Sequence, residues 1–296
     1  MVVSSMANPD TIGVLIARAR RALEEAGVEN AAQEALWLIA HVIGLESHRL
    51  ISQTEQPIAE GQWMEAESCV ARRAAREPLQ YILGTQEFCG LEFHVSPSVL
   101  IPRPESELIV QEALRWGEFT DGALIVDVGT GSGCVAITLA TIVEGARILG
   151  IDSSSEALEV AKLNGGRHAV SDRVEWLQGD LLSPLRERGL AGKVNAIVSN
   201  PPYIAEGDWA GLQPEVQQFE PRAALVAGPQ GTEIHGRLFG ESGEFLVPGG
   251  FLIVELGQGQ LPTIQRLAKQ IGGYAPLEVV EDAAGIERVA IAQWVG

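Results

Sequence analysis

The sequence is poor in the residues that hold metals or disulfides. Its three cysteines, Cys69, Cys89 and Cys134, are scattered, and no two of them stand at metal-ligand spacing. The five histidines form no cluster of the His-Glu-x-x-His kind. We therefore expect no metal site, and cysteines that stay reduced.

The sequence also lacks targeting and membrane features. No apolar run reaches the length needed to span a bilayer, and residues 1–10 do not show the basic-then-apolar order of a signal peptide. Met1 and Met6 are both possible starts of the natural chain. Together with the cysteine usage, these features predict a cytoplasmic protein without a membrane partner.

Basic residues are scarce. The chain has 21 Lys and Arg against 39 Asp and Glu, which gives a formal net charge of −18. A protein that grips a nucleic-acid backbone carries a surplus of Lys and Arg. The sequence therefore predicts no direct nucleic-acid binding, although a local basic patch such as Arg72, Arg73 and Arg76 could still contact an acidic partner.

The 296 residues suffice for two domains, and the hydrophobic pattern divides them. Residues 1–86 read as a helical domain, with helices over 11–26, 30–43, 48–52 and 59–76. Alternation around Gly90 predicts a β-hairpin, and residues 87–102 form the linker. A helix over 105–116 opens the third segment, 103–296.

Strands and helices alternate through the third segment. Expected strands cover 123–128, 147–151, 174–177, 194–199, 251–256, 277–280 and 288–292, with helices over 134–143 and 260–270. Residues 153–156 predict a capping box for a helix that ends near Gly165. This order is typical of an α/β protein with a doubly wound, mostly parallel seven-stranded sheet.

A glycine-rich loop follows the first of these strands. It runs Asp127-Val128-Gly129-Thr130-Gly131-Ser132-Gly133, and Asp152 and Asp180-Leu181 follow the next two strands. The spacing Gly-x-Gly-x-Gly is not the Gly-x-Gly-x-x-Gly that packs a pyrophosphate, and Asp127 would repel one. Asp127 suits the amino group of a methionine moiety, Asp152 suits ribose hydroxyls, and Asp180 with Leu181 could bracket an adenine. The loop therefore favours S-adenosylmethionine over a dinucleotide.

A stiff polar turn follows the strand over 194–199. It consists of Asn200-Pro201-Pro202-Tyr203, and its two prolines forbid a continued strand or an immediate helix. The Asn200 side-chain oxygen and the Pro201 carbonyl could accept hydrogen bonds from a planar NH2 group, with Tyr203 against its flat face. Taken alone, the tetrapeptide equally suits an ordinary turn. With the glycine loop it indicates methylation of a planar nitrogen.

With both motifs in place, the chain resembles the HemK/PrmC family, the peptide-chain release factor N5-glutamine methyltransferases. The resemblance rests on the two motifs and on further segments: Glu77 to Gly84, Val99 to Glu105, Phe219-Glu220-Pro221 and Glu287-Arg288-Val289. It implies a class I, Rossmann-like methyltransferase domain over 103–296. Because residues 1–86 are separate from every cofactor motif, we expect them to recognise the protein substrate. The implied substrate is the glutamine of the Gly-Gly-Gln loop of release factors.

The resemblance also assigns site residues. It implies that Gly129 to Gly133, Asp152, Leu181 and Asn200 contact the cofactor, while Asn200, Pro201, Pro202 and Tyr203 hold the glutamine. Leu181 departs from the family, where this position is often aromatic, and no residue of the 226–236 loop is assigned. We expect direct in-line transfer, with Asn200, Pro201 and Tyr203 as the catalytic residues. Glu255 is expected to be an exposed strand-end carboxylate, with a supporting role as the alternative.

Two other functions stay open on the sequence. An adenine-N6 nucleic-acid methyltransferase uses the same turn on a flipped base, although the net charge counts against it. A non-catalytic S-adenosylmethionine-binding module is the other, and the intact set of motif residues counts against it.

Overall fold

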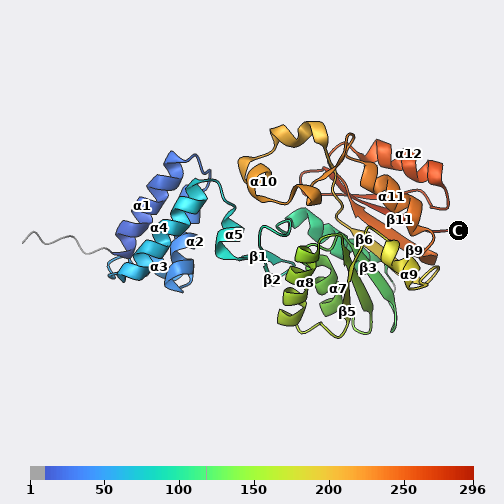
Figure 1. The fold of residues 1–296 in the computed structure, drawn as a ribbon, viewed down its shortest axis with the longest axis horizontal. Helices are drawn as coiled ribbons and strands as arrows, with labels where there is room; N and C mark the ends of the chain where they lie inside the picture. The colour runs from blue at the N-terminus through green and yellow to red at the C-terminus, as the bar shows by residue number, and fades with distance from the viewer. Residues whose placement is uncertain (1–10, 118) are drawn as a thin grey trace, which may run out of the picture. The chain divides into compact units, whose positions relative to one another are not determined.

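The computed structural model describes residues 11–117 and 119–296. The expectations for residues 1–10 lie outside this range. The chain divides into two compact units. The helical unit comprises Met1–Gly84 together with Gln213–Phe219, and the sheet unit comprises Thr85–Leu212 and Glu220–Gly296 (Figure 1).

The helical unit begins as its apolar spacing predicts. Helix α1 spans Ile12–Glu25, and the Thr11 hydroxyl accepts a hydrogen bond from the Val14 amide, which caps the helix. Helix α2 spans Ala31–Ile43 and ends at Gly44, whose φ of 74° suits a residue without a Cβ. Asn30 stands at the start of α2, but its side chain makes no capping bond, so the expected cap is wrong.

The remaining helices complete this unit. They are α3 (Ser47–Leu50), the 3-10 helix η1 (Ile51–Gln53), α4 (Glu60–Ala74), α5 (Leu79–Leu83) and α10 (Pro214–Phe219). All of them except η1 and α10 contribute buried residues to its apolar core. The largest fully buried side chains of the core are Leu15, Leu23, Leu38, Ile39 and Leu50. Helices α5 and α10 are absent from the sequence prediction.

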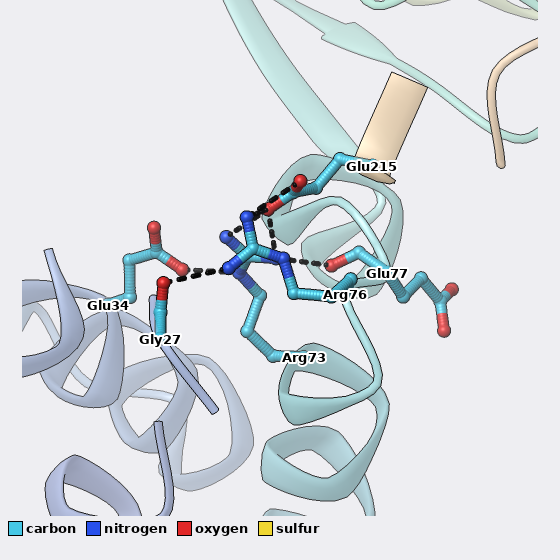
Figure 2. Close-up of polar contacts among 6 residues, drawn as sticks. All are labelled: Gly27, Glu34, Arg73, Arg76, Glu77 and Glu215. Carbon is cyan, nitrogen blue, oxygen red and sulfur yellow. Dashed lines mark hydrogen bonds and ion pairs between the residues drawn. The ribbon is translucent and has the colours of Figure 1, made fainter. Parts of the chain in front are cut away.

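A network of ion pairs joins α10 to the helices before it. Glu215 accepts hydrogen bonds from Arg73 at 3.1 Å and from Arg76 at 2.9 Å (Figure 2). Arg73 also donates to Glu34 on α2 at 2.5 Å, and Arg76 donates to the Gly27 carbonyl at 2.9 Å. Arg73 is only 6% exposed, so the basic face expected near residues 72–76 is partly used inside the unit.

The sheet unit is built on seven strands in the order β10-β11-β9-β6-β3-β4-β5. The five strands from β9 to β5 are parallel, and β10 and β11 run antiparallel at one edge. Their bounds are β3 Leu124–Val128, β4 Arg147–Asp152, β5 Val174–Gln178, β6 Val194–Ser199, β9 Leu246–Glu255, β10 Glu278–Glu281 and β11 Glu287–Gln293. The predicted doubly wound, mostly parallel sheet is confirmed.

Helices cover both faces of this sheet (Figure 1). On one face α6 (Glu107–Trp116) and α7 (Cys134–Ile142) bury Ile109 and Ile137, and α8 (Ser155–Arg167) lies beside them. On the other face α9 (Ser183–Glu187), α11 (Glu233–Ser242) and α12 (Leu261–Ile271) bury Leu185, Leu238 and Ile264. This packing fixes the strand ends on which the polar motifs stand.

The start of α8 corrects a detail of the prediction. The Ser154 hydroxyl accepts a hydrogen bond from the Ala157 amide at 3.1 Å. A capping box needs a Glu or Gln at the position of Ala157 to return a bond, so a single serine cap replaces the expected box.

Short elements fill the connections. The predicted hairpin is formed by β1 (Thr85–Phe88) and β2 (Leu91–His94). The others are η2 (Pro104–Ser106), β7 (Ile204–Ala205), η3 (Glu206–Gly211), η4 (Arg222–Ala224) and β8 (Val226–Gly228). Among the described residues, no helix has the length and apolarity required to cross a bilayer.

Candidate active site

Four neighbouring parallel strands bring the polar motifs to one edge of the sheet. The glycine loop follows β3, Asp152 ends β4, Asp180 follows β5, and Asn200 follows β6. Strands β6, β3, β4 and β5 lie side by side in this order. Their carboxyl ends therefore meet where open α/β sheets bind ligands.

The glycine loop is held in a sharp turn by the neighbouring strand. The Gly129 and Thr130 amides both donate to the Ile151 carbonyl, at 2.8 and 3.0 Å, and the Gly131 amide donates to Asp152 Oδ2 at 2.9 Å. Gly131 has a φ of 54°, and a Cβ there would meet no atom closer than 4.0 Å. The space beside Gly131 is thus open to a ligand that approaches the backbone.

The last glycine of the loop serves packing as well as the turn. Gly133 has a φ of 81°, and a Cβ there would lie 2.9 Å from the ring of Trp176. Its position in the motif is therefore set partly by the core under the site.

Asp127 lies beneath the loop and is only 2% exposed. Its Oδ2 accepts hydrogen bonds from the Thr130 hydroxyl at 2.6 Å and the Ala136 amide at 3.2 Å, which holds the start of α7. Burial raises the pKa of this carboxyl to about 7 despite these bonds. The expected contact with an ammonium group would have to use the other carboxylate oxygen.

Asp152 presents a carboxylate whose two oxygens each hold one backbone amide. Oδ2 accepts from Gly131 and Oδ1 accepts from Ser154, both at 2.9 Å. Each carboxylate oxygen can accept a second hydrogen bond, which suits the two hydroxyls of a ribose. Burial raises the pKa of Asp152, against the lowering effect of these amide bonds.

A cavity of about 270 Å³ opens over these strand ends. Every motif of the sequence prediction contributes to its wall, together with residues that the sequence did not single out. Its lining includes Val99, Leu100, Gly129, Gly131, Ile151, Asp152, Ser154, Asp180, Leu181, Asn200, Pro202, Pro221 and Ile234. The mixture of apolar walls, open glycine backbone and the Asp152 carboxylate fits an adenosine-containing cofactor such as S-adenosylmethionine.

Asp180 and Leu181 differ in how they meet this cavity. The Asp180 carboxylate pairs with Arg237 on α11 at 2.7 Å and 3.1 Å, and its side chain is 68% exposed. It is therefore not free to receive an adenine amine while this pair is intact. Leu181 lines the cavity and has a φ of 47°, a backbone conformation that L side chains rarely adopt.

A second cavity of about 50 Å³ lies beside the first and shares residues with it. Asn200, Gly129, Gly131 and Leu100 line both. The smaller one adds the following side chains: Pro102, Arg103, Ser106, Asp127, Thr130, Ser132, Cys134 and Val135. Asn200 thus stands at the junction of the two cavities.

The turn after β6 is anchored through the side chains around it. The Asn200 Nδ2 donates to the Ser106 hydroxyl oxygen at 2.8 Å, and the Ser106 hydroxyl donates to Glu255 Oε2 at 2.6 Å. Tyr203 also donates its hydroxyl to Glu255. Glu255 is 1% exposed, so the expectation of an exposed strand-end carboxylate is wrong, and burial raises its pKa to about 7.

Two further polar residues near the site, Glu220 and Gln260, were not identified from the sequence. Buried Glu220 accepts a hydrogen bond from the Ile101 amide at 3.2 Å and pairs with Arg103. Gln260 Nε2 donates to the Tyr203 carbonyl at 2.8 Å and to the Gly231 carbonyl at 3.0 Å, which ties the 226–236 loop to the turn. The sequence singled out the segments that contain Ile101 and Glu220. It did not indicate that the two segments contact each other.

Comparison with known proteins assigns the two parts of the chain. Residues 15–84 match the family of the PrmC N-terminal domain, and residues 107–213 match the methyltransferase small domain. Among solved structures, a 16S rRNA methyltransferase of T. thermophilus, in complex with AdoMet and guanosine, has a TM-score of 0.53 and 21% identity. That likeness covers 71% of this chain and 49% of the other, and it shows the fold.

Relatives of known name cover nearly the whole chain. The release factor glutamine methyltransferase of Geobacter sulfurreducens is 43% identical over 279 residues, which are 94% of this chain and 95% of that protein. The enzyme of the same name from Moorella thermoacetica is 39% identical, over 95% of this chain and 98% of that protein. At this identity and coverage, the chain belongs to the family of release factor glutamine methyltransferases.

Proposed function

We propose that this protein transfers a methyl group from S-adenosylmethionine to the side-chain amide nitrogen of the glutamine in the Gly-Gly-Gln loop of peptide-chain release factors. The observation that carries the assignment is the junction of the two cavities at Asn200, between the glycine loop and the Asn-Pro-Pro-Tyr turn. With this substrate, we propose that the enzyme acts in the cytoplasm.

The cofactor would be held by the strand ends. Asp152 would accept hydrogen bonds from the ribose, Leu181 would contact the adenine, and the open backbone at Gly129 and Gly131 would allow close approach. When bound, S-adenosylmethionine supplies an electrophilic methyl group on a sulfonium. No step calls for a covalent bond to the protein.

The chain's own contribution is to orient the glutamine amide. An amide nitrogen is a poor nucleophile because its lone pair is delocalised into the carbonyl. Asn200 Oδ1 and the Pro201 carbonyl would accept the two amide hydrogens, which turns the nitrogen toward the methyl carbon. These acceptors strengthen their bonds as the nitrogen becomes positive in the transition state, and one hydrogen then leaves as a proton.

The helical unit would recognise the protein substrate. Residues 15–84 belong to the PrmC N-terminal family, and every residue of the cofactor cavity belongs to the sheet unit. We therefore assign residues 1–86 to recognition, 87–102 to the linker and 103–296 to catalysis. Recognition and cofactor binding should then respond to different substitutions.

The test supplies the purified chain with methyl-labelled S-adenosylmethionine and one of three acceptors: a release factor, the same factor with the loop glutamine replaced by alanine, or nucleic acid. We expect label only in the unmodified release factor. Label in nucleic acid would instead support adenine methylation, and cofactor binding without transfer to any acceptor would support a non-catalytic module.

A further inference from the structure

Asn200 is linked to a buried carboxylate through a serine. Asn200 Nδ2 lies 2.8 Å from Ser106 Oγ, and Ser106 Oγ lies 2.6 Å from Glu255 Oε2. Ser106 is 3% exposed and Glu255 is 1% exposed, so water does not compete for these bonds. The three residues come from η2, the end of β9 and the end of β6, and all belong to the sheet unit.

The direction of these hydrogen bonds follows from the chemistry of the carboxylate. An ionised carboxylate can only accept hydrogen bonds, so the Ser106 hydroxyl must donate its hydrogen to Glu255. The Ser106 oxygen is then left as an acceptor, and only the NH2 arm of the Asn200 amide can satisfy it. The other arm, Oδ1, is thereby turned away from Ser106.

An asparagine amide has nearly the same shape after a half-turn that exchanges oxygen and NH2. Only one of the two orientations offers an acceptor oxygen to the glutamine amide. In the other, the Asn200 NH2 group would face the NH2 group of the glutamine. We propose that Glu255 and Ser106 are positioning residues that lock the Asn200 amide in its productive orientation. This inference rests on the proposed function of Asn200.

The same carboxylate also holds the other end of the turn. Glu255 accepts the Tyr203 hydroxyl as well as that of Ser106. On its backbone side, the Glu255 carbonyl accepts a 2.8 Å hydrogen bond from His235 Nε2, and burial lowers the pKa of His235, so this ring is neutral. One residue thus fixes both Asn200 and Tyr203.

The lock depends on the ionisation of Glu255. Burial raises its pKa to about 7; Glu105 acts in the same direction, while Ser106, Tyr203 and Arg288 act against it. Once protonated, Glu255 can donate to Ser106, and the serine can then donate to Asn200 Oδ1. The productive orientation therefore loses its advantage as pH falls through about 7.

The first test removes the serine hydroxyl. Ser106→Ala should lower the single-turnover rate of release factor methylation on the order of 10- to 100-fold, the scale of a misoriented reacting group, with cofactor affinity unchanged. Ser242→Ala is the matched control, because Ser242, at the end of α11, is also buried and its Oγ makes a 2.6 Å hydrogen bond with the Tyr274 hydroxyl. In an Asn200→Ala background, Ser106→Ala should not lower the single-turnover rate any further.

The second test is a pH profile from 5.5 to 8.5. For a group of pKa about 7, the wild-type rate should be about 10-fold lower at pH 6 than at the plateau. Glu255→Gln should be slower at pH 8 and should lose this step, because glutamine does not titrate. Asp127 also has a pKa of about 7, and if it caused the step, Glu255→Gln would keep it.

The outcomes separate the two proposals. A Ser106→Ala rate equal to that of Ser242→Ala, or a pH step that survives in Glu255→Gln, would overturn the positioning role while the wild type still methylates release factor. A wild type that binds cofactor and leaves release factor unlabelled would instead overturn the proposed function.

Discussion

The Gly131 amide donates a 2.9 Å hydrogen bond to Asp152 Oδ2, and this bond joins the glycine loop to the end of β4. Asp152 therefore shapes the loop as well as facing the cavity. Asp152→Ala should weaken S-adenosylmethionine binding by about 1.5–3 kcal/mol, the range for hydrogen bonds to a charged group. Calorimetric titration measures this loss of affinity. An unchanged dissociation constant would contradict the assignment of Asp152 to cofactor binding.

Asp180 should matter less for the cofactor. Its carboxylate is exposed and already paired with Arg237, so Asp180→Ala should change the affinity by less than about 1 kcal/mol, the range for exposed pairs. The same titration serves, with Asp152→Ala as the reference. A loss as large as that of Asp152→Ala would show that Asp180 leaves Arg237 to bind the adenine amine.

Asn200→Ala tests the chemistry of the turn. The loss of one preorganised transition-state hydrogen bond typically costs ~100- to 1000-fold in turnover. The two prolines and the bond from Gln260 to the Tyr203 carbonyl remain, so the turn should persist. Melting temperature, cofactor affinity and single-turnover rate are measured on one preparation. A variant that melts early yet methylates at nearly the wild-type rate would reduce Asn200 to a turn former.

Asp127 predicts a pH dependence of stability. Its folded pKa of about 7 lies above its ordinary value of 3.8, so the folded state binds more protons between these values. The contribution of this group to the free energy of unfolding therefore falls as pH rises across that window. Asp127→Asn should become more stable relative to wild type between pH 5 and pH 8, by on the order of 2 kcal/mol. Urea unfolding at the two pH values measures this difference, and a difference that shrinks with pH would contradict it.

Glu215 tests the helical unit separately from the cofactor cavity. Glu215→Ala leaves Arg73 and Arg76 without their shared carboxylate and should cost about 2 kcal/mol of stability. The pair is 8% and 14% exposed, whereas the control pair, Arg18 with Glu67, is 61% and 47% exposed. Glu67→Ala should therefore change the free energy of unfolding only slightly.

The functional readout of Glu215→Ala follows from the proposed division of labour. Methylation of intact release factor should fall while the dissociation constant for S-adenosylmethionine stays the same. A weakened cofactor affinity with normal methylation at saturation would contradict the assignment of recognition to the helical unit.

The sheet was predictable because its strands are short apolar runs between turn signals. Val194–Ser199 was placed to the residue, since its buried β-branched side chains end at two prolines. The amphipathic helix α11 was not predicted, because Glu233–Ser242 contains two internal glycines, which weaken a helical pattern. Its absence also hid Arg237, the partner of Asp180.

The motifs of the candidate site were predictable, but their supporting contacts were not. Glycines and aspartates at the ends of predicted strands can be recognised from their spacing in the sequence. The contact of Ser106 with Glu255 joins residues 149 positions apart, and nothing in either local sequence records it. The burial of Glu255 likewise depends on how β9 meets η2, which only the folded chain determines.

Helix α10 sits in the sequence among catalytic residues yet packs with the helical unit. Glu215 forms ion pairs with Arg73 and Arg76 of that unit, and Arg73 also pairs with Glu34. A chimera that takes residues 1–84 from one relative and the rest from another would therefore inherit the two halves of this network from different parents. Grafting the recognition module between species should succeed only when residues 213–219 travel with it.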